Sequence, residues 1–267
     1  MSSGRKKFNG RLWLELLSPN AVARGRELSS GARRAGLDVG AAWLRPSVTR
    51  ALHGSRVAYL PPAVLDASPT FVDIGANVGD WTAAVLHVLP TANVIVVEPT
   101  PANVAILRER FAGQRGVTVH DVAVSDRATT MTLHVAPNSV FNSLLPLRRE
   151  TLQRYGMGAR VSEVEVACRP LDDLLADVES VAVLKIDVQG AESAVLAGAR
   201  DVLRRTAAIL IETNYVSHYE GDQLLWDLHP QLRDAGFELY RNAFEYHDGA
   251  GRLLWADAVY ARSDLLR

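Results

Sequence analysis

The sequence is poor in the features that mark several special classes of protein. One cysteine, Cys168, occurs in 267 residues, so an internal disulfide cannot form, and the chain shows no cysteine–histidine spacing for zinc. No apolar run approaches the ~18 residues that cross a bilayer, and polar residues interrupt the segment after the basic residues 5–7. We therefore expect neither a transmembrane segment nor a secretory signal. The shortage of cysteine favours a reducing compartment, and we expect a cytoplasmic protein.

The rest of the composition is that of a globular chain with unevenly distributed charge. Hydrophobic residues make up 48% of the sequence and charged residues 22%, which argues against a disordered or fibrous protein. The net charge of −1 conceals a balance of +8 over residues 1–56 and −9 over the remainder. The basic N-terminal segment could therefore contact an anionic surface, a nucleic acid or the acidic body of the same chain.

Short apolar runs alternate with helical patterns from residue 70 onward. Five runs predict strands, at residues 70–74, 93–97, 117–119, 181–186 and 207–211. Strands that alternate with helices indicate an α/β fold with a doubly wound, mostly parallel sheet. Two closing runs, 237–241 and 255–261, are joined by a turn near Asp248. They predict a seven-stranded sheet with one antiparallel member at its edge.

Two segments depart from this alternation. Residues 1–60 are predicted to form a helical N-terminal extension, with helices at 12–17 and 21–36, and the prolines at 61–62 begin the main domain, 61–267. An insertion between the third and fourth strands contains β-like segments at 130–135 and 161–167 around a loop. This loop, 137–146, is predicted to cover the bound acceptor, with Ser139, Asn142 and Ser143 as neutral hydrogen-bonding groups.

The turn after the first predicted strand has the composition of a cofactor site. Asp73, Gly75, Asn77 and Gly79 lie where a buried strand meets a helix, the edge at which open α/β sheets bind ligands. Glycines let the backbone approach a ligand closely, and a helix N-terminus attracts a carboxylate or a phosphate. Glu98 ends the second strand, where an acidic side chain can accept hydrogen bonds from both ribose hydroxyls of an adenosine.

The spacing of this turn distinguishes between two adenosine cofactors. A dinucleotide site would show three glycines as G-x-G-x-x-G, whereas here two glycines lie four apart and Asp73 precedes the first by two. A carboxylate is unfavourable beside a pyrophosphate but suits the ammonium group of S-adenosylmethionine. We therefore predict that the turn and Glu98 bind S-adenosylmethionine, with the adenine near Asp121 and Val122 at the end of the third strand.

Further stretches of the chain, taken with the turn, are similar to one known family. The stretches are Asp73–Gly79, Glu98–Asn103, Ala123–Asp126, Leu171–Leu174, Leu184–Glu192 and Val195–Ala199. In this order they resemble the FkbM-type S-adenosylmethionine-dependent methyltransferases over residues 71–213. The resemblance implies the Rossmann-like fold of the class I methyltransferases and O-methylation of a sugar or natural product.

Candidates for the chemistry lie at the ends of the fourth and fifth strands. Methyl transfer to an alcohol requires removal of the hydroxyl proton. Asp187 ends the fourth strand and is predicted to be catalytic, and His218, on a loop after the fifth strand, is a candidate general base. Asp187, Glu212 and Asn214 together would suit a hard cation such as Mg²⁺, so a metal site is a second hypothesis for these residues.

Two neighbours of Asp187 have weaker claims to a role in the chemistry. Gln189 is neutral, which weakens any proposal that it serves as a base or as an anionic metal ligand. Alternation along the strand predicts that Lys185 points away from this edge and forms a structural salt bridge.

Three activities share parts of this pattern. An NAD(P)-binding oxidoreductase would share the strand order and Glu98 but should carry the three-glycine fingerprint. A nucleic-acid methyltransferase could use the basic N-terminal segment, but the prolines and aromatic typical of base-amine methylation do not follow the fourth strand. We therefore predict an O-methyltransferase whose partner is a small molecule with a hydroxyl group, a sugar, glycosylated metabolite or polyketide, and we expect no nucleic acid. The sequence leaves a homo-oligomer open.

Overall fold

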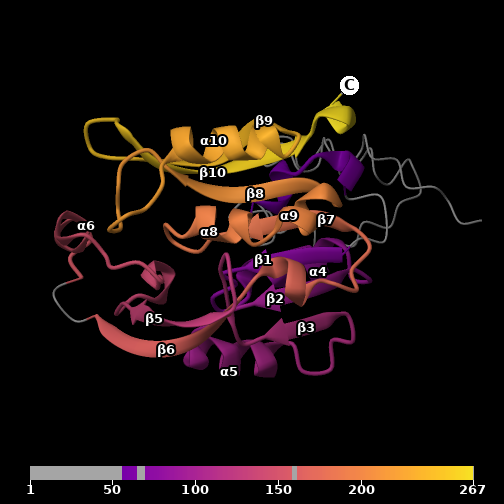
Figure 1. Ribbon diagram of the computed structural model, residues 1–267, viewed down its shortest axis with the longest axis horizontal. Helices are drawn as coiled ribbons and strands as arrows, with labels where there is room; N and C mark the ends of the chain where they lie inside the picture. Colours follow the sequence, from indigo (N-terminus) through magenta and orange to yellow (C-terminus); the bar gives the residue numbers. More distant parts are fainter. Residues whose placement is uncertain (1–55, 65–69, 158–160, 267) are drawn as a thin grey trace, which may run out of the picture.

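A seven-stranded sheet lies at the centre of the computed structural model, which describes residues 56–64, 70–157 and 161–266. The strand order is β3-β2-β1-β7-β8-β10-β9 (Figure 1). In this order the strands are Val117–His120, Asn93–Val97, Thr70–Ile74, Val181–Ile186, Thr206–Asn214, Leu253–Arg262 and Phe237–His247. β3, β2, β1, β7 and β8 pair in parallel, and β10 is antiparallel to both of its neighbours. The predicted doubly wound, mostly parallel sheet is confirmed.

The antiparallel strand lies one place inside the edge of the described sheet, so its predicted position at the edge was wrong. β10 takes the inner position because its side chains are mostly buried, with Val259 and Ala261 at 0% exposure. β9 forms the edge and exposes Glu238, Arg241 and Glu245. Charged side chains on an edge strand protect it from pairing with other chains.

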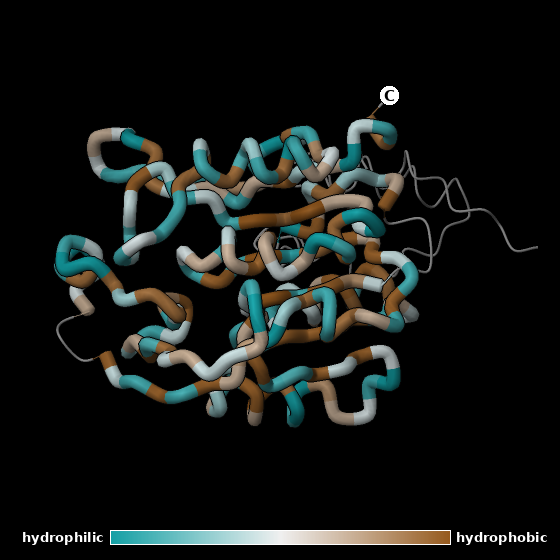
Figure 2. Tube along the Cα trace, viewed as in Figure 1, coloured by the Kyte–Doolittle hydropathy of each residue, from teal (hydrophilic) through white to brown (hydrophobic). Residues whose placement is uncertain are grey.

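Helices cover both faces of the sheet and enclose two hydrophobic layers. One face carries α4 (Asp80–Val88), α5 (Pro101–Arg110) and the short turns η1 (Val57–Tyr59), η2 (Pro62–Val64) and η4 (Ser263–Leu266). The other face carries α7 (Leu171–Leu174), α8 (Glu192–Ala197), α9 (Arg200–Arg204) and α10 (Leu225–Asp234). The central strands between these layers are predominantly hydrophobic (Figure 2). Such runs are typical of parallel strands that are buried on both faces.

The predicted insertion forms a second sheet of three strands with the order β4-β6-β5. β4 (Ala123–Val124) is parallel to β6 (Ser162–Arg169), and β5 (Thr129–Val135) is antiparallel to it. The chain between β5 and β6 forms η3 (Ser139–Phe141) and α6 (Arg149–Arg154). A β-bridge between Leu147 and Tyr219 joins the insertion to the loop after β8. The insertion therefore lies over the carboxyl ends of the main strands.

Most of the predicted N-terminal extension, including the helices predicted at 12–17 and 21–36, lies outside the described residues. Where the description begins, Val57, Leu60 and Val64 are buried in the same core cluster as Phe71. The boundary between residues 60 and 61 stays a prediction. Within the described ranges, no helix combines the length and hydrophobicity needed to cross a membrane.

Candidate active site

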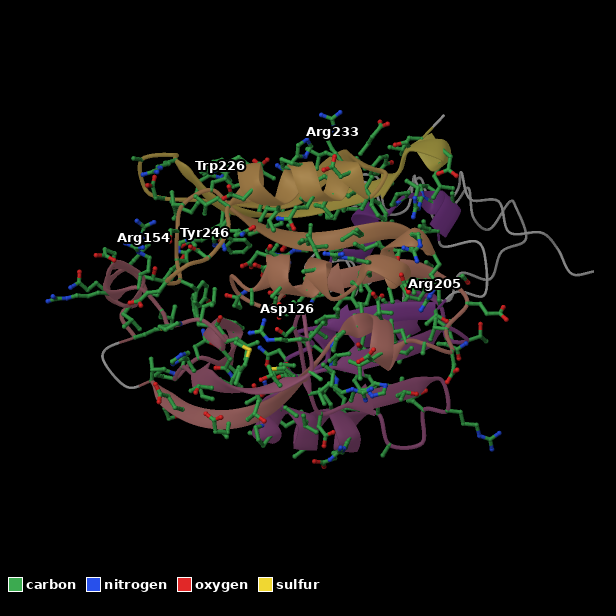
Figure 3. The ribbon with its side chains drawn as sticks, viewed as in Figure 1. Asp126, Arg154, Arg205, Trp226, Arg233 and Tyr246 are labelled. Carbon is green, nitrogen blue, oxygen red and sulfur yellow. The ribbon has the colours of Figure 1, made fainter. Side chains whose placement is uncertain are left out.

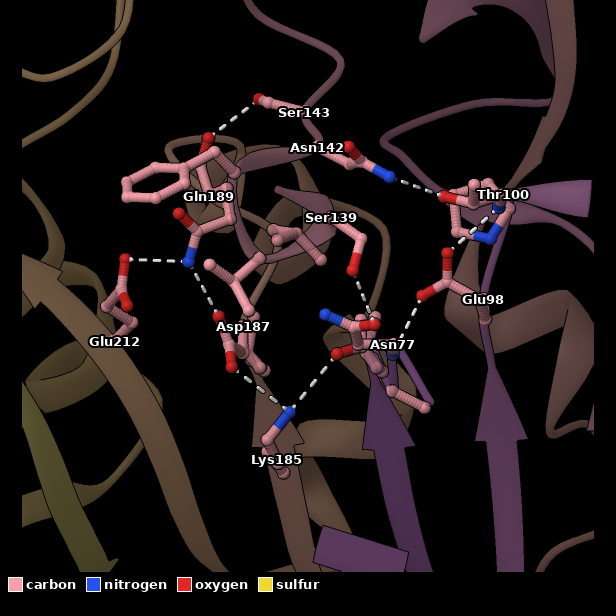
Figure 4. Close-up of a pocket in the computed structure, with 18 of the residues that line it drawn as sticks. Asn77, Glu98, Thr100, Ser139, Asn142, Ser143, Lys185, Asp187, Gln189 and Glu212 are labelled. Carbon is pink, nitrogen blue, oxygen red and sulfur yellow. Dashed lines mark hydrogen bonds and ion pairs between the residues drawn. The ribbon is translucent and has the colours of Figure 1, made fainter. Parts of the chain in front are cut away.

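A cavity of about 630 Å³ lies at the carboxyl ends of the parallel strands. Its volume is in the range of sites that hold cofactors and small molecules. Residues that follow β1, β2, β7 and β8 line one side of it, and Ser139, Asn142 and Ser143 of the insertion lie across from them (Figure 4). Tyr155 of the insertion also lines the cavity. This is the edge at which open α/β sheets bind ligands.

Glycine is required at positions 75 and 79 of the first turn for different structural reasons. Gly75 lines the cavity with φ +73°, and a Cβ there would lie 1.8 Å from the carbonyl oxygen of Asp187. Gly79 precedes α4 with φ +84°, and a Cβ there would lie 2.6 Å from the ring of Phe111. Asn77 also lines the cavity, whereas Gly79 does not. The structure thus brings Gly75 and Asn77 to the predicted cofactor site and gives Gly79 a packing role.

Glu98 is held at the cavity by three hydrogen-bond donors of the protein. Its Oε2 accepts from the Asn77 N–H at 2.9 Å, and its Oε1 accepts from the Thr100 N–H at 2.9 Å and from Asn103 Nδ2 at 3.3 Å. Burial raises the pKa of Glu98, and these donors oppose that rise. A carboxylate has about four acceptor positions, so these three donors leave acceptor capacity for the ribose, and the predicted contact of Glu98 with the ribose hydroxyls stays a prediction.

Asp73 is fully buried (0% exposed) and does not line the cavity. Its Oδ2 accepts a 2.7 Å hydrogen bond from Thr82 Oγ1, and its Oδ1 lies 3.1 Å from Nζ of Lys185. The structure therefore does not place this carboxylate where it was predicted to meet the cofactor ammonium. Its partners give it a positioning role, because it fixes Lys185 beneath the first turn.

The two residues predicted beside the adenine occupy different environments. Val122 lines the cavity. The side chain of Asp121 is 60% exposed and forms a 2.8 Å ion pair with Arg108 of α5. This contact lowers the pKa of Asp121. The carboxylate is held at the surface by Arg108, so only Val122 keeps its predicted position.

Lys185 lies in the site, although the sequence predicted that it would point away. Its Nζ lies 3.1 Å from Asp73 and 3.3 Å from Asp187, and it donates to the carbonyl oxygen of Gly75 at 3.3 Å (Figure 4). Burial lowers the pKa of Lys185, but the two carboxylates outweigh burial and raise it above its ordinary value. Lys185 lies near the end of β7, and Asp187 directly follows the strand in extended pairing with β1, so the two residues, two apart, share a face. The predicted salt bridge exists, but within the cavity wall.

Gln189 joins the two carboxylates that were predicted to hold a metal ion. Its Nε2 donates to Asp187 at 2.9 Å and to Glu212 at 3.1 Å, and its Oε1 accepts from the Tyr219 hydroxyl at 2.7 Å. Burial and the charge of Asp187 raise the pKa of Glu212 well above its ordinary value. Within the described part of the chain, no group of three His, Cys, Asp or Glu residues is arranged for a metal ion. The Gln189 amide lies between Asp187 and Glu212 and already donates to both, so a Mg²⁺ ion on the predicted set of Asp187, Glu212 and Asn214 would have to displace it.

His218 is a buried imidazole that lines the cavity and has one nitrogen without a hydrogen-bond partner among the described residues. It is 6% exposed, and this nitrogen is Nε2. Thr151 Oγ1 lies 3.5 Å from Nδ1 and donates its proton to the His218 carbonyl oxygen at 2.9 Å. Thr151 Oγ1 can accept from the ring only in the tautomer that carries the proton on Nδ1, and this tautomer leaves a lone pair on Nε2. Burial lowers the pKa of His218, so the ring is neutral at neutral pH.

Comparison with known proteins identifies the family to which this chain belongs. Residues 73–239 match the model of the methyltransferase FkbM domain, which is more than half of the chain. The chain belongs to the FkbM methyltransferase family. It is an S-adenosylmethionine-dependent methyltransferase, and the family predicted from the sequence is confirmed.

Curated relatives of this methyltransferase are similar over most of its length. The 2-O-methyltransferase NoeI of Sinorhizobium fredii (strain NBRC 101917 / NGR234) is 28% identical over 220 residues, which cover 79% of this chain and 84% of that protein. The 31-O-demethyl-FK506 methyltransferase FkbM of Streptomyces tacrolimicus is 28% identical over 193 residues, which cover 62% and 71%. The crystal structure of methyltransferase FkbM from Methylobacillus flagellatus KT aligns with TM-score 0.47 and 20% identity over 72% of this chain and 43% of that chain. Neither curated relative is named as an oxidoreductase or as a nucleic-acid methyltransferase.

In this FkbM-family methyltransferase the insertion is tied to the turns that follow β1, β2 and β7. Three side chains of the loop donate the hydrogen bonds: Ser139 to Asn77 Oδ1 (3.0 Å), Asn142 to Thr100 Oγ1 (3.1 Å) and Ser143 to the Gln189 carbonyl oxygen (2.7 Å). These groups were predicted to bind an acceptor. In the structure their hydrogen bonds hold the insertion over the cofactor turns (Figure 4).

Several residues that line the cavity were not predicted from the sequence. Thr100 had a local signal, because it follows Glu98 by two residues and its N–H binds that carboxylate. Tyr155, Tyr246 and Trp255 also line the cavity. They come from the insertion, β9 and β10, and no local pattern predicts that these three elements converge.

Proposed function

We propose that this methyltransferase transfers a methyl group to a hydroxyl of a small molecule: a sugar, a glycosylated metabolite or a polyketide. The observation that carries the proposal is one continuous cavity that is lined both by Glu98, at the end of β2, and by His218, on the loop after β8, whose buried Nε2 has no hydrogen-bond partner among the described residues. The names of the two curated relatives, a 2-O-methyltransferase and a 31-O-demethyl-FK506 methyltransferase, support a hydroxyl as the acceptor.

The cofactor end of the cavity suits an adenosine group. Glu98 offers its remaining acceptor capacity to the ribose, and Val122 offers an apolar surface to the adenine. Gly75 and Asn77 line the cavity beside the turn, where the methionine portion would lie. Glycine at position 75 also lets the turn after β7 approach, since a Cβ there would meet the Asp187 carbonyl oxygen. When bound, S-adenosylmethionine supplies an electrophilic methyl group.

The acceptor hydroxyl must lose its proton as its oxygen forms the new bond to carbon. His218 Nε2 carries the lone pair that accepts this proton, and the neutral state of the ring makes it available. Asp187 lines the same cavity with its side chain 35% exposed and is held by Lys185 and Gln189. Its carboxylate orients the acceptor by accepting a hydrogen bond from another hydroxyl of that molecule, because the single proton of the reacting hydroxyl is directed to His218 Nε2.

Calorimetric titration with S-adenosylmethionine and, separately, with NAD⁺ tests the cofactor assignment. We expect micromolar binding of S-adenosylmethionine, no binding of NAD⁺, and at least ~10-fold weaker S-adenosylmethionine binding in Glu98→Gln. The matched control is Glu109→Gln on the exposed face of α5, which should bind as the wild type does. Binding of NAD⁺ alone, or an unchanged affinity in a folded Glu98→Gln protein, would refute the assignment. Radiolabelled methyl transfer to neutral hydroxyl compounds then tests the acceptor class.

A further inference from the structure

Aromatic rings form the end of the cavity that lies farthest across the sheet from Glu98. Trp255 of β10 stacks on Tyr246 of β9, with ring centroids 5.4 Å apart and planes at 15°. The Tyr246 ring lies 6.4 Å from that of Tyr155, which follows α6 in the insertion. Figure 3 shows Tyr246 at the end of the sheet near α6, on the same side as Arg154. All three rings line the cavity, and Tyr246 and Trp255 lie outside the stretch that matches the family, 73–239.

Asn214 stands beside these rings with an unused amide. It ends β8, pairs in register with Trp255 and lines the cavity. Its side chain is buried at 2% exposure, and neither Oδ1 nor Nδ2 has a hydrogen-bond partner in the described ranges. Buried amides are ordinarily satisfied, because an unpaired donor or acceptor opposes folding. An amide with two unpaired atoms on a cavity wall therefore indicates a ligand that both donates and accepts.

The charges at this end of the cavity are already compensated. Asp257 pairs with Arg56 at 2.5 Å, and Asp187 pairs with Lys185 at 3.3 Å. Both described cations of the cavity lining are thus engaged by carboxylates. A phosphate or carboxylate on the ligand would find no cation here that lacks a carboxylate partner and would lie near Glu212, so a neutral ligand fits best.

We propose that Asn214, Tyr155, Tyr246 and Trp255 form the acceptor subsite and hold a neutral ring that carries a second hydroxyl beside the one that is methylated. The proposal rests on the proposed function and narrows its acceptor. The C–H face of the ring packs on the aromatic side chains. The second hydroxyl donates to Asn214 Oδ1 and accepts from Asn214 Nδ2. This pair of contacts selects which hydroxyl of the ring faces His218.

Asn214→Leu tests the subsite, because its two effects separate a binding role from a structural one. Leucine has a similar size and no polar atoms, so the melting temperature should stay equal or rise once the unpaired amide is removed. The protein is first saturated with S-adenosylhomocysteine. Calorimetry then measures the binding of three glycosides, each at millimolar concentration: methyl fucoside, methyl rhamnoside and methyl glucoside. We expect at least one glycoside to bind and its Kd to rise at least ~10-fold in Asn214→Leu. A lower melting temperature with an unchanged Kd would overturn the proposal.

Tyr246→Ala and Tyr240→Ala form a matched pair on β9. Both tyrosines are 38% exposed, but only Tyr246 lines the cavity. Tyr246→Ala should weaken glycoside binding at least ~10-fold and Tyr240→Ala should leave it unchanged. If S-adenosylhomocysteine binds and no glycoside does, the subsite proposal fails while the cofactor assignment stands. If neither S-adenosylmethionine nor S-adenosylhomocysteine binds, the proposed function fails, and glycoside binding to the free protein decides the subsite separately.

Discussion

The hydroxyl of Ser143 donates a 2.7 Å hydrogen bond to the carbonyl oxygen of Gln189. This contact joins the inserted sheet to the turn after β7, although the two residues are 46 positions apart. The Gln189 backbone has φ +59°, an uncommon conformation for a residue other than glycine. The insertion thus supports a strained turn at the reactive edge and, through it, the side chain that joins Asp187 to Glu212.

Ser143→Ala should loosen the insertion over the bound cofactor. The variant loses the hydrogen bond to Gln189 and a second one within the loop, which Ser143 Oγ accepts from the Leu145 N–H at 2.9 Å. Only the bond to Gln189 joins the insertion to the turn, and its loss costs about 1 kcal/mol, a change of about 5-fold in an equilibrium constant. We expect S-adenosylhomocysteine to dissociate about 5-fold faster in a stopped-flow displacement experiment. Thr132→Ala is the control, because it removes a hydroxyl of the same inserted sheet that bonds only to the exposed side chain of Glu165. S-adenosylhomocysteine should dissociate from this variant at the wild-type rate. Equal rates in all three proteins would show that the insertion does not retain the cofactor.

Asp73→Asn should act on stability more than on cofactor affinity. Asp73 is fully buried and faces Lys185 at 3.1 Å, so removal of its charge leaves a buried ammonium with Asp187 as its remaining carboxylate. The loss of one partner of a buried pair costs about 3 kcal/mol. Urea unfolding should show this loss, whereas Asp126→Asn, whose partner Arg127 is largely exposed, should change the free energy of unfolding by less than about 0.5 kcal/mol. A larger fall in S-adenosylmethionine affinity than in Glu98→Gln would restore Asp73 as a direct ligand.

The parts of the site that the sequence predicts are those that local backbone geometry determines. Gly75 and Glu98 each end or follow a buried strand, and parallel pairing necessarily brings such ends to one edge. The positions of the Asp121 and Lys185 side chains depend instead on contacts with residues that are distant in the sequence. Arg108, one helix away, holds Asp121 at the surface, and the register of β1 with β7 sets Asp73 directly beside Lys185.

Long-range pairing explains the remaining differences from the sequence-based predictions. The turn after β9 indicates two antiparallel strands, but their burial decides which of them is the inner one. Trp255 reaches Asn214 only because β10 takes that inner position beside β8. An acceptor subsite built in this way has no signature in a short stretch of sequence.

The pH dependence of catalysis should report the state of His218. Burial and Arg154 lower its pKa below the ordinary 6.5, and Asp222 opposes them. Since the base acts in its neutral form, kcat/KM should be constant at neutral pH and fall only as the pH drops below the ordinary range of histidine. His218→Gln should lose about 10² to 10⁴ in rate together with this acidic limb. His247→Gln alters an exposed histidine outside the cavity, and it should keep the wild-type rate and the acidic limb of the pH profile. If His218→Gln kept the same acidic limb, the group that accepts the proton would not be His218.

The stability of the fold should fall with rising pH in part because of Glu192. This side chain is 1% exposed, and its Oε1 accepts from the N–H groups of Val188 and Gly190. Burial raises its pKa from 4.5 to about 7. The folded state therefore holds this proton more tightly than the unfolded state, so the stabilisation is complete below pH 4.5 and is lost as the pH rises to about 7. The loss amounts to about 3 kcal/mol.

Glu192→Gln removes this titration and keeps a carbonyl oxygen that can accept from both N–H groups. Urea unfolding at pH 5 and at pH 8 should show a smaller decrease in the variant than in the wild type, by up to about 3 kcal/mol. Glu165→Gln on the exposed side of β6 should decrease as the wild type does. An identical decrease in all three proteins would show that Glu192 is ionised in the folded state.

Gln189→Glu should convert the neutral link between Asp187 and Glu212 into a metal-responsive site. In the wild type the Gln189 amide donates to both carboxylates at 2.9 and 3.1 Å, so a cation would have to displace it. A third carboxylate at this position would repel the other two and would complete an oxygen ligand set that suits a divalent cation. We expect the variant to lose about 2 kcal/mol of stability in EDTA and to recover it in millimolar Mn²⁺. The melting temperatures of the wild type and of Gln153→Glu, on the exposed face of α6, should not respond to Mn²⁺. A response of the wild type itself would show that Asp187 and Glu212 hold a metal ion without a third carboxylate, and would return Mg²⁺ to the mechanism.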